Sequence, residues 1–133
     1  MTQLFVHRDA VADLEAIRVR GETAEHGLLL AFLLQAQRDV GLLESLTEDW
    51  FGADGMAGYS VRKLVQASRQ GRQLWRVKIL GLKGLAVGYR VIYAFNRDRD
   101  KIYVLGIPSR DIAYDQDHPR VQRLIAVYDS LRD

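Results

Sequence analysis

The 133-residue sequence contains no cysteine, so disulfide bonds, thiolate-bound metals and a cysteine nucleophile are all excluded. Long apolar segments are also missing, since the longest stretch, residues 28–34, has about a third of the length needed to cross a bilayer. Residues 1–13 mix charged with apolar side chains, which is not the pattern of a signal peptide. These absences lead us to expect a cytoplasmic protein without membrane association.

Acidic residues are absent from a long central part of the chain. Between Gly55 and Arg97 there are nine basic residues and no Asp or Glu. Residues 1–59 contain four Arg and ten acids, a net charge of −6, whereas residues 60–133 contain fifteen basic residues and seven acids, a net charge of +8. Such an unmixed basic segment attracts polyanions, and nucleic acid is the commonest of these in the cytosol. The alternative is a basic surface that pairs with an acidic partner chain or maintains solubility.

The length and the apolar content of 48% predict one domain over residues 1–133 with a single core. We divide it into a strand plus helical hairpin (residues 1–58) and a basic sheet with a C-terminal helix (residues 59–133). The fold class expected is α+β, with the short strand and αα-hairpin packed on a small, mostly antiparallel sheet that contains a three-stranded meander.

In the first half, residues 4–6 are predicted to form the short strand. A helix capped by Asp9 follows and stops at Gly21. A second helix is predicted over residues 23–46, because apolar residues recur there at helical spacing without a proline. Glycines and aspartates over residues 49–58 then indicate a loop.

In the second half, the period of the apolar pattern changes to two after Gly71, which indicates strands. Three are predicted, over residues 74–80, 87–95 and 101–107, and an amphipathic helix starts at Pro119. Residues 59–70 are compatible either with a short strand or with a basic turn.

Strand alternation assigns the basic residues to one face of this sheet. Arg76 and Lys78 alternate with apolar neighbours in the first strand, and Arg90 lies opposite an aromatic face in the second. The alternative for Arg76 and Lys78 is that they form only the solvated face of an amphipathic strand. For Arg90, a buried ion pair with Asp111 or Asp115 is the alternative.

Several of these segments resemble the RelE/ParE superfamily of bacterial toxins. The similar pieces are residues 74–79, 88–93 and 102–107, followed by Arg110 and Tyr114. The resemblance extends over residues 74–114, while the first sixty residues agree in pattern alone. In the members that cleave mRNA, basic residues of the first meander strand, the arginine of the second, an arginine past the last strand and a nearby tyrosine form the active site.

Transferred to this sequence, the resemblance implies Lys78, Arg90, Arg110 and Tyr114 as catalytic residues. Cleavage of RNA without a metal requires a proton to leave the 2′-OH, which attacks phosphorus while charge builds up on the phosphoryl oxygens. Guanidinium groups such as those of Arg90 and Arg76 can bind that charge. Lys78 suits the base, because neighbouring cations favour the neutral form of an amine.

The remaining roles follow the same chemistry. Arg110 is expected to neutralise or protonate the leaving oxygen. Tyr114 is expected to stack on a base or to transfer a proton, although a place in the core or at its rim is the alternative. Residues expected to bind RNA around this centre are Arg62, Lys63, Arg72, Arg76 and Lys83.

We expect no metal, no cofactor and no catalytic histidine. The three histidines share no predicted element, and His118, just before Pro119, is best explained as a residue that starts a helix. Asp111, Asp115 and Asp117 fall across a loop and a helix start, where capping and turn formation explain them.

The resemblance implies a toxin that cleaves mRNA, with the ribosome as the expected place of action and a cognate antitoxin protein as partner. Two other functions remain open. One is a superfamily member that poisons DNA gyrase or another target by binding, without catalysis. The other is a degenerate relative that merely binds nucleic acid.

Overall fold

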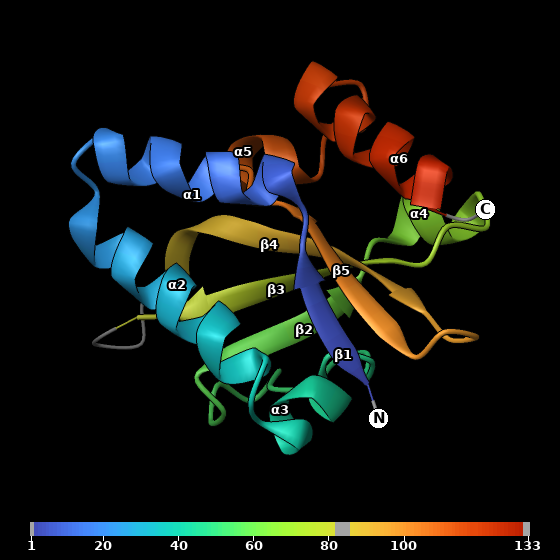
Figure 1. The fold of residues 1–133 in the computed structure, drawn as a ribbon, viewed down its shortest axis with the longest axis horizontal. Helices are drawn as coiled ribbons and strands as arrows, with labels where there is room; N and C mark the ends of the chain where they lie inside the picture. Colours follow the sequence, from blue (N-terminus) through green and yellow to red (C-terminus); the bar gives the residue numbers. More distant parts are fainter. Residues whose placement is uncertain (1, 82–85, 132–133) are drawn as a thin grey trace.

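The computed structural model describes residues 2–81 and 86–131, which fold into a five-stranded sheet between two groups of helices (Figure 1). The sheet has the strand order β1-β5-β4-β3-β2. Strand β1 pairs with β5 in parallel, and the other three pairs are antiparallel. The strands are β1 (Gln3–Val6), β2 (Tyr59–Lys63), β3 (Leu74–Leu80), β4 (Ala86–Asn96) and β5 (Lys101–Gly106).

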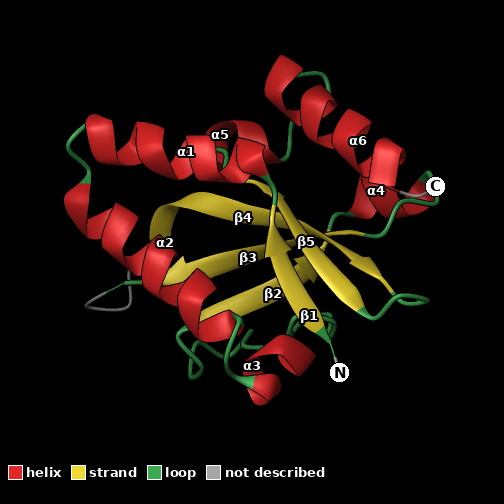
Figure 2. Cartoon of the chain, viewed as in Figure 1, coloured by secondary structure: helices red, strands yellow, loops and turns green. Residues whose placement is uncertain are grey.

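Six helices surround this sheet in the described part of the chain (Figure 2). They are α1 (Arg8–Val19), α2 (Thr23–Ala36), α3 (Val40–Ser45), α4 (Val65–Arg69), α5 (Arg110–Ala113) and α6 (Pro119–Leu131). The class is therefore α+β, as predicted. Among the described residues, no helix combines the length and the apolar character needed to span a membrane.

The two faces of the sheet carry separate cores. Trp75, Val77 and Tyr93 belong to the larger one, which also contains buried residues of α1, α2 and α3. On the other face, Ile92 and Leu105 pack in a smaller cluster with residues of α4, α5 and α6. Figure 1 shows α2 and α3 lying apart from α4 and α6. The smaller cluster covers part of its face, and Arg76, Lys78 and Arg90 lie on the same face.

The sheet is larger than the predicted three-stranded meander. Its central strands β3, β4 and β5 follow the predicted boundaries within a residue or so, but β1 adds a parallel edge and β2 an antiparallel one. Residues 59–70, for which the sequence left two interpretations, form β2 and then the short helix α4. Pairing with the exposed edges of the meander satisfies backbone groups that the meander alone would leave open.

The predicted single helix over residues 23–46 is wrong. Helix α2 ends at Ala36, and α3 begins at Val40 after Asp39, whose backbone is extended. The Asp39 carboxylate accepts a hydrogen bond from the amide of Leu42 at 3.1 Å. Aspartate favours this N-cap position over a helix interior, and the turn it makes breaks the helix in two.

Histidines, and not aspartates, cap two of the helices. Nδ1 of His7 accepts a hydrogen bond from the amide of Asp9 at 3.1 Å, so the prediction of Asp9 as the cap of α1 is wrong by two residues. Nδ1 of His118 likewise accepts from the amide of Arg120 at 3.2 Å, and the predicted start of α6 is confirmed. Both imidazoles thus satisfy amides in the first turn of a helix.

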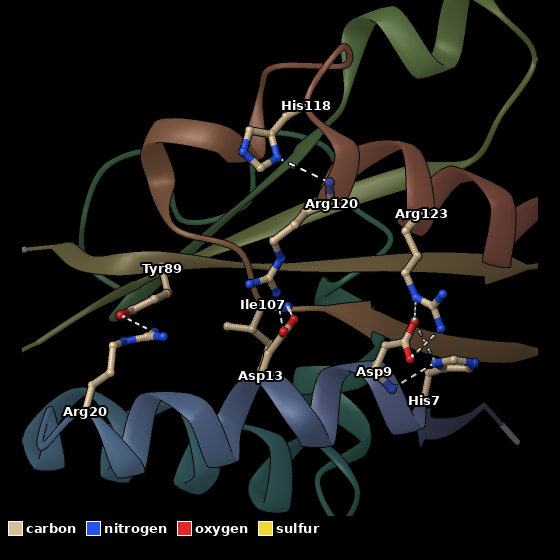
Figure 3. A network of polar contacts seen from close by, with 9 residues as sticks. All are labelled: His7, Asp9, Asp13, Arg20, Tyr89, Ile107, His118, Arg120 and Arg123. Atoms are coloured by element: carbon tan, nitrogen blue, oxygen red, sulfur yellow. Dashed lines mark hydrogen bonds and ion pairs between the residues drawn. The ribbon is translucent and has the colours of Figure 1, made fainter.

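Ion pairs fasten α6 to α1 (Figure 3). Arg123 donates to the Asp9 carboxylate from Nε at 2.7 Å and from Nη2 at 3.2 Å, and Arg120 pairs with Asp13. The second oxygen of Asp13 accepts from the amide of Ile107 at 2.8 Å, just after β5. The Asp13 carboxylate therefore connects α1, α6 and the end of β5.

Acid is expected to weaken this attachment. The hydrogen bond from Arg123 holds the pKa of Asp9 below its ordinary value of 3.8. A carboxylate whose pKa is lowered in the folded state stabilises the fold at higher pH, and this contribution disappears as the pH falls below about 4. The denaturant midpoint of unfolding should fall when the pH is changed from neutral to acidic. This fall should be smaller in Asp9→Asn than in the wild type. An equal fall in both would contradict this role, and high salt should reduce the difference because the pair is exposed.

Candidate functional site

The register of the three strands β2, β3 and β4 brings four cations together. Arg62 of β2 lies directly opposite Arg76 of β3, and Lys78 of β3 lies directly opposite Arg90 of β4. Because residues two apart in a strand share a face, all four side chains belong to the same face of the sheet. We call Arg62, Arg76, Lys78 and Arg90 the basic quartet. Like charges directly opposite one another destabilise a sheet. An anion bound between them would reduce this repulsion.

Acidic side chains compensate little of this charge. Among the described residues, one member of the quartet has a carboxylate within 4.0 Å: Nε of Arg62 lies 3.5 Å from Oδ1 of Asp49. No such partner is found there for Arg76, Lys78 or Arg90. In this part of the chain, the charges of Arg76, Lys78 and Arg90 are therefore not neutralised by a nearby carboxylate.

Arg76 is half-buried at the centre of the quartet. Its Nη1 donates to the carbonyl oxygen of Ser60 at 3.1 Å and to the Ser60 hydroxyl at 3.2 Å. Its Nε is buried and has no hydrogen-bond partner. Burial lowers the pKa of this guanidinium; Tyr114 opposes the shift, and the nearby charges of Arg90 and Arg62 add to it. The group still keeps its charge at neutral pH, and it is held in place with unused capacity to donate.

Arg90 is the most buried cation of the quartet, with 7% of its surface exposed. Its Nη1 donates to the carbonyl oxygens of Val87 at 2.8 Å and Tyr89 at 3.2 Å, and its Nε donates to the hydroxyl of Tyr114 at 3.2 Å. The alternative of an ion pair with Asp111 or with Asp115 is not seen among the described residues.

Tyr114 stands at the end of α5 with 51% of its surface exposed, so it does not belong to the core. Because its oxygen accepts the hydrogen bond from Arg90, its own proton can be donated elsewhere. Arg90 and Tyr114, which the sequence separates by 24 residues, therefore form one polar unit beside the quartet.

Two hollows border the quartet, and Arg62 and Arg76 line both. The first, of about 350 Å³, lies toward α6 and has mainly apolar walls, with Tyr114 among the lining residues. The second, of about 280 Å³, is lined by Lys78 and Ser60 and by residues of the loop before β2. The cations therefore separate an apolar hollow from a basic one.

Other residues predicted for the site lie outside this group. Arg110 is exposed, and its closest charged partner is its neighbour Asp111, at 4.0 Å. Arg72 donates to both oxygens of Asp129 at 3.1 Å, which ties the start of β3 to α6. The ammonium of Lys63 lies 5.2 Å from the ring centroid of Trp75, which belongs to the core on the opposite face. Lys83 is outside the described residues.

Sequence reasoning missed Trp50 and Ser60. Trp50 lies in the loop between α3 and β2, and its ring centroid is 3.3 Å from the Arg62 guanidinium carbon. An aromatic residue within a loop of glycines and aspartates is the signal that points to Trp50. The sequence contains no such signal for Ser60, because its position opposite Lys78 depends on the pairing of β2 with β3.

No group of three or more histidine, aspartate or glutamate side chains in the described ranges is placed to hold a metal ion. Comparison of the chain with protein-family models, with curated proteins and with solved structures finds no match. The geometry of the quartet is therefore the main indication of function.

Proposed function

We propose that this chain is a ribonuclease toxin similar to the mRNA-cleaving members of the RelE/ParE superfamily, and that the basic quartet and Tyr114 hold the scissile phosphate. The observation that carries the proposal is the pairing of like charges, Arg62 with Arg76 and Lys78 with Arg90, with one nearby carboxylate among the described residues. Selection for stability alone disfavours such pairs, whereas a phosphodiester that bridges them relieves the repulsion.

The reaction proposed is transesterification within the RNA. The 2′ oxygen forms a bond to phosphorus as it loses its proton, and the bond from phosphorus to the 5′ oxygen breaks. The products are a 2′,3′-cyclic phosphate and a 5′-hydroxyl end. Arg76 stabilises the charge on the phosphoryl oxygens, and Lys78 receives the 2′ proton.

Tyr114 suits the step at the leaving oxygen. Its hydroxyl is held by Nε of Arg90 and is exposed, so its proton is available to the 5′ oxygen. In this scheme Arg90 contributes its charge at the phosphate and also positions Tyr114. Arg110 is exposed and has an acidic neighbour, so a role at the leaving oxygen requires its side chain to turn toward the substrate.

The partners proposed are mRNA, with the ribosome as the place of cleavage, and an antitoxin whose acidic segment covers the quartet. The cytoplasm is the compartment in which these partners meet. An antitoxin that neutralises the quartet would compete with RNA for the same cations.

Mapping of transcript 5′ ends after induced expression tests the proposal. We expect growth arrest together with new 5′-hydroxyl ends, and in-frame positions of these ends would indicate cleavage on the ribosome. Lys78→Ala should abolish both effects while the protein stays folded. Arg97→Ala removes an equal charge from an exposed position in the turn after β4, and should cleave like the wild type.

Three other results would contradict the proposal. Growth arrest that persists in Lys78→Ala together with DNA-damage signalling would favour a gyrase poison. Absence of arrest and of cleavage, with RNA still bound, would leave a nucleic-acid-binding relative. An equal loss of growth arrest and cleavage in Lys78→Ala and Arg97→Ala would show that the quartet is not the functional site.

A further inference from the structure

Trp50 is a large aromatic residue that contributes little to the core. It keeps 59% of its surface exposed, and its φ of 71° lies in the left-handed region that bulky side chains avoid. Beyond its contact with Arg62, an exposed indole on an unfavourable backbone gains little from packing in the fold. A ligand that covers the ring gives a reason for both features.

Several contacts fix this indole beside the quartet. The amide of Trp50 donates to the carbonyl oxygen of Val61 in β2 at 2.9 Å. The preceding Asp49 accepts from the amide of Lys63 at 3.0 Å and lies 3.5 Å from Nε of Arg62. The guanidinium of Arg62 stacks on the ring. The loop is therefore fastened along the edge strand, and the ring has a defined place on the basic face.

The hollow of about 280 Å³ places the indole and the cations around one space. Its lining includes Trp50, Ser60, Arg62, Arg76 and Lys78. The lining thus combines an aromatic ring with guanidinium, ammonium and hydroxyl donors, which correspond to the two parts of a nucleotide, a flat base and a phosphate. Its volume is near the lower end of the range for small-ligand sites.

We propose that this hollow is a nucleotide subsite for single-stranded RNA, in which a base stacks on Trp50 and the adjoining phosphate contacts Arg76 and Lys78. Bases inside a duplex are paired and stacked on each other, so they cannot reach the ring, and a single strand is required. The choice of RNA as the ligand rests on the proposed function. A base bound on Trp50 would determine which nucleotide of the RNA lies next to Tyr114.

Intrinsic fluorescence can report this contact directly. The chain has two tryptophans, and Trp75 is buried with 4% of its surface exposed, so quenching by a stacked base comes from Trp50. A short single-stranded RNA carrying 2′-O-methyl groups at every position serves as the probe, because it cannot be cleaved. We expect strong quenching by this probe and little by the corresponding duplex.

Variants separate stacking from charge. Trp50→Ala should weaken binding of the probe about 5- to 150-fold and leave the dependence of affinity on salt unchanged, and Trp50→Phe should recover most of the affinity. Arg76→Met should lower the slope of log affinity against log salt by about 0.7, the share of one phosphate contact on a single strand. Circular dichroism confirms that each variant is folded.

The outcomes distinguish this subsite from the proposed function. Cleavage by the wild type, together with unchanged affinity in Trp50→Ala, overturns the subsite and leaves the nuclease in place. Equal quenching by duplex and single strand also overturns it. Failure of the folded wild type to bind or cleave any RNA overturns both, and quenching by an acidic protein partner but not by RNA would assign Trp50 to that partner.

Discussion

Replacement of Arg76 by methionine is expected to lower RNA cleavage roughly 10²- to 10³-fold and, at the same time, to stabilise the fold by about 1 kcal/mol. The loss of activity follows from its position, since it is the central cation of the quartet and has a buried Nε without a partner. A fixed donor aimed at developing charge contributes about this much to a reaction rate.

The gain in stability has a separate cause. The folded state keeps the half-buried Arg76 guanidinium directly opposite Arg62 and close to Arg90, where burial and like charge both oppose its charged form. Methionine fills a similar volume without that charge, and water can serve the half-buried Ser60 in its place. Opposite changes in activity and stability are typical of a residue retained for function.

Two measurements check this expectation. Single-turnover cleavage of a labelled RNA gives the loss in rate, and urea unfolding at equal salt gives the change in stability. Arg97→Met, at an exposed turn, is the matched control and should change neither quantity appreciably. If Arg76→Met instead destabilises the protein by several kcal/mol, Arg76 has a structural role and the quartet is not a functional site.

Replacement of Gly52 by alanine is expected to destabilise the protein by about 2–4 kcal/mol. A Cβ atom at this position would lie 1.9 Å from the carbonyl oxygen of Tyr59, and the φ of 74° is itself unfavourable for alanine. The obstacle is backbone at the start of β2, so neither segment can move aside cheaply. The loop that carries Trp50 should then separate from the edge strand.

Gly55→Ala provides the control for this experiment. Gly55 has a similar φ of 81°, but a Cβ atom there meets nothing within 4 Å. Its substitution should therefore cost the backbone preference alone, about 1–2 kcal/mol. Urea unfolding of both variants, with Trp50 fluorescence as a second reading, isolates the clash. Equal destabilisation by the two substitutions would show that the close approach to Tyr59 is unimportant.

Local patterns predicted the centre of the fold well. Alternation in β3 assigned Trp75 and Val77 to the core and Arg76 and Lys78 to the other face, and burial confirms both assignments. This succeeds because the side-chain period of a strand is a property of the backbone alone. The start of α6 at Pro119 was predicted for a similar reason, since proline fits the first turn of a helix.

Long-range pairing limited the rest of the prediction. The partner of β1 and the edge position of β2 depend on contacts between distant segments, which no local pattern encodes. Of the residues that the sequence predicted for the site, the structure brings Arg76, Lys78, Arg90 and Tyr114 close together, but the opposition of Arg62 to Arg76 required the register. Local reasoning also gave equal weight to Arg72, which the structure pairs with Asp129 on α6.

The parallel pairing of β1 with β5 has a consequence for biosynthesis. Gln3 pairs with Lys101 and Val6 with Val104, so β1 has no partner strand until the much later β5 has been synthesised. Contacts of such high sequence separation slow folding, because a long loop must close before they form. The α1–α2 hairpin can assemble early, whereas the sheet that carries the cations is completed late. The cations of the sheet should therefore take up their final arrangement only after the distant strands β1 and β5 have paired.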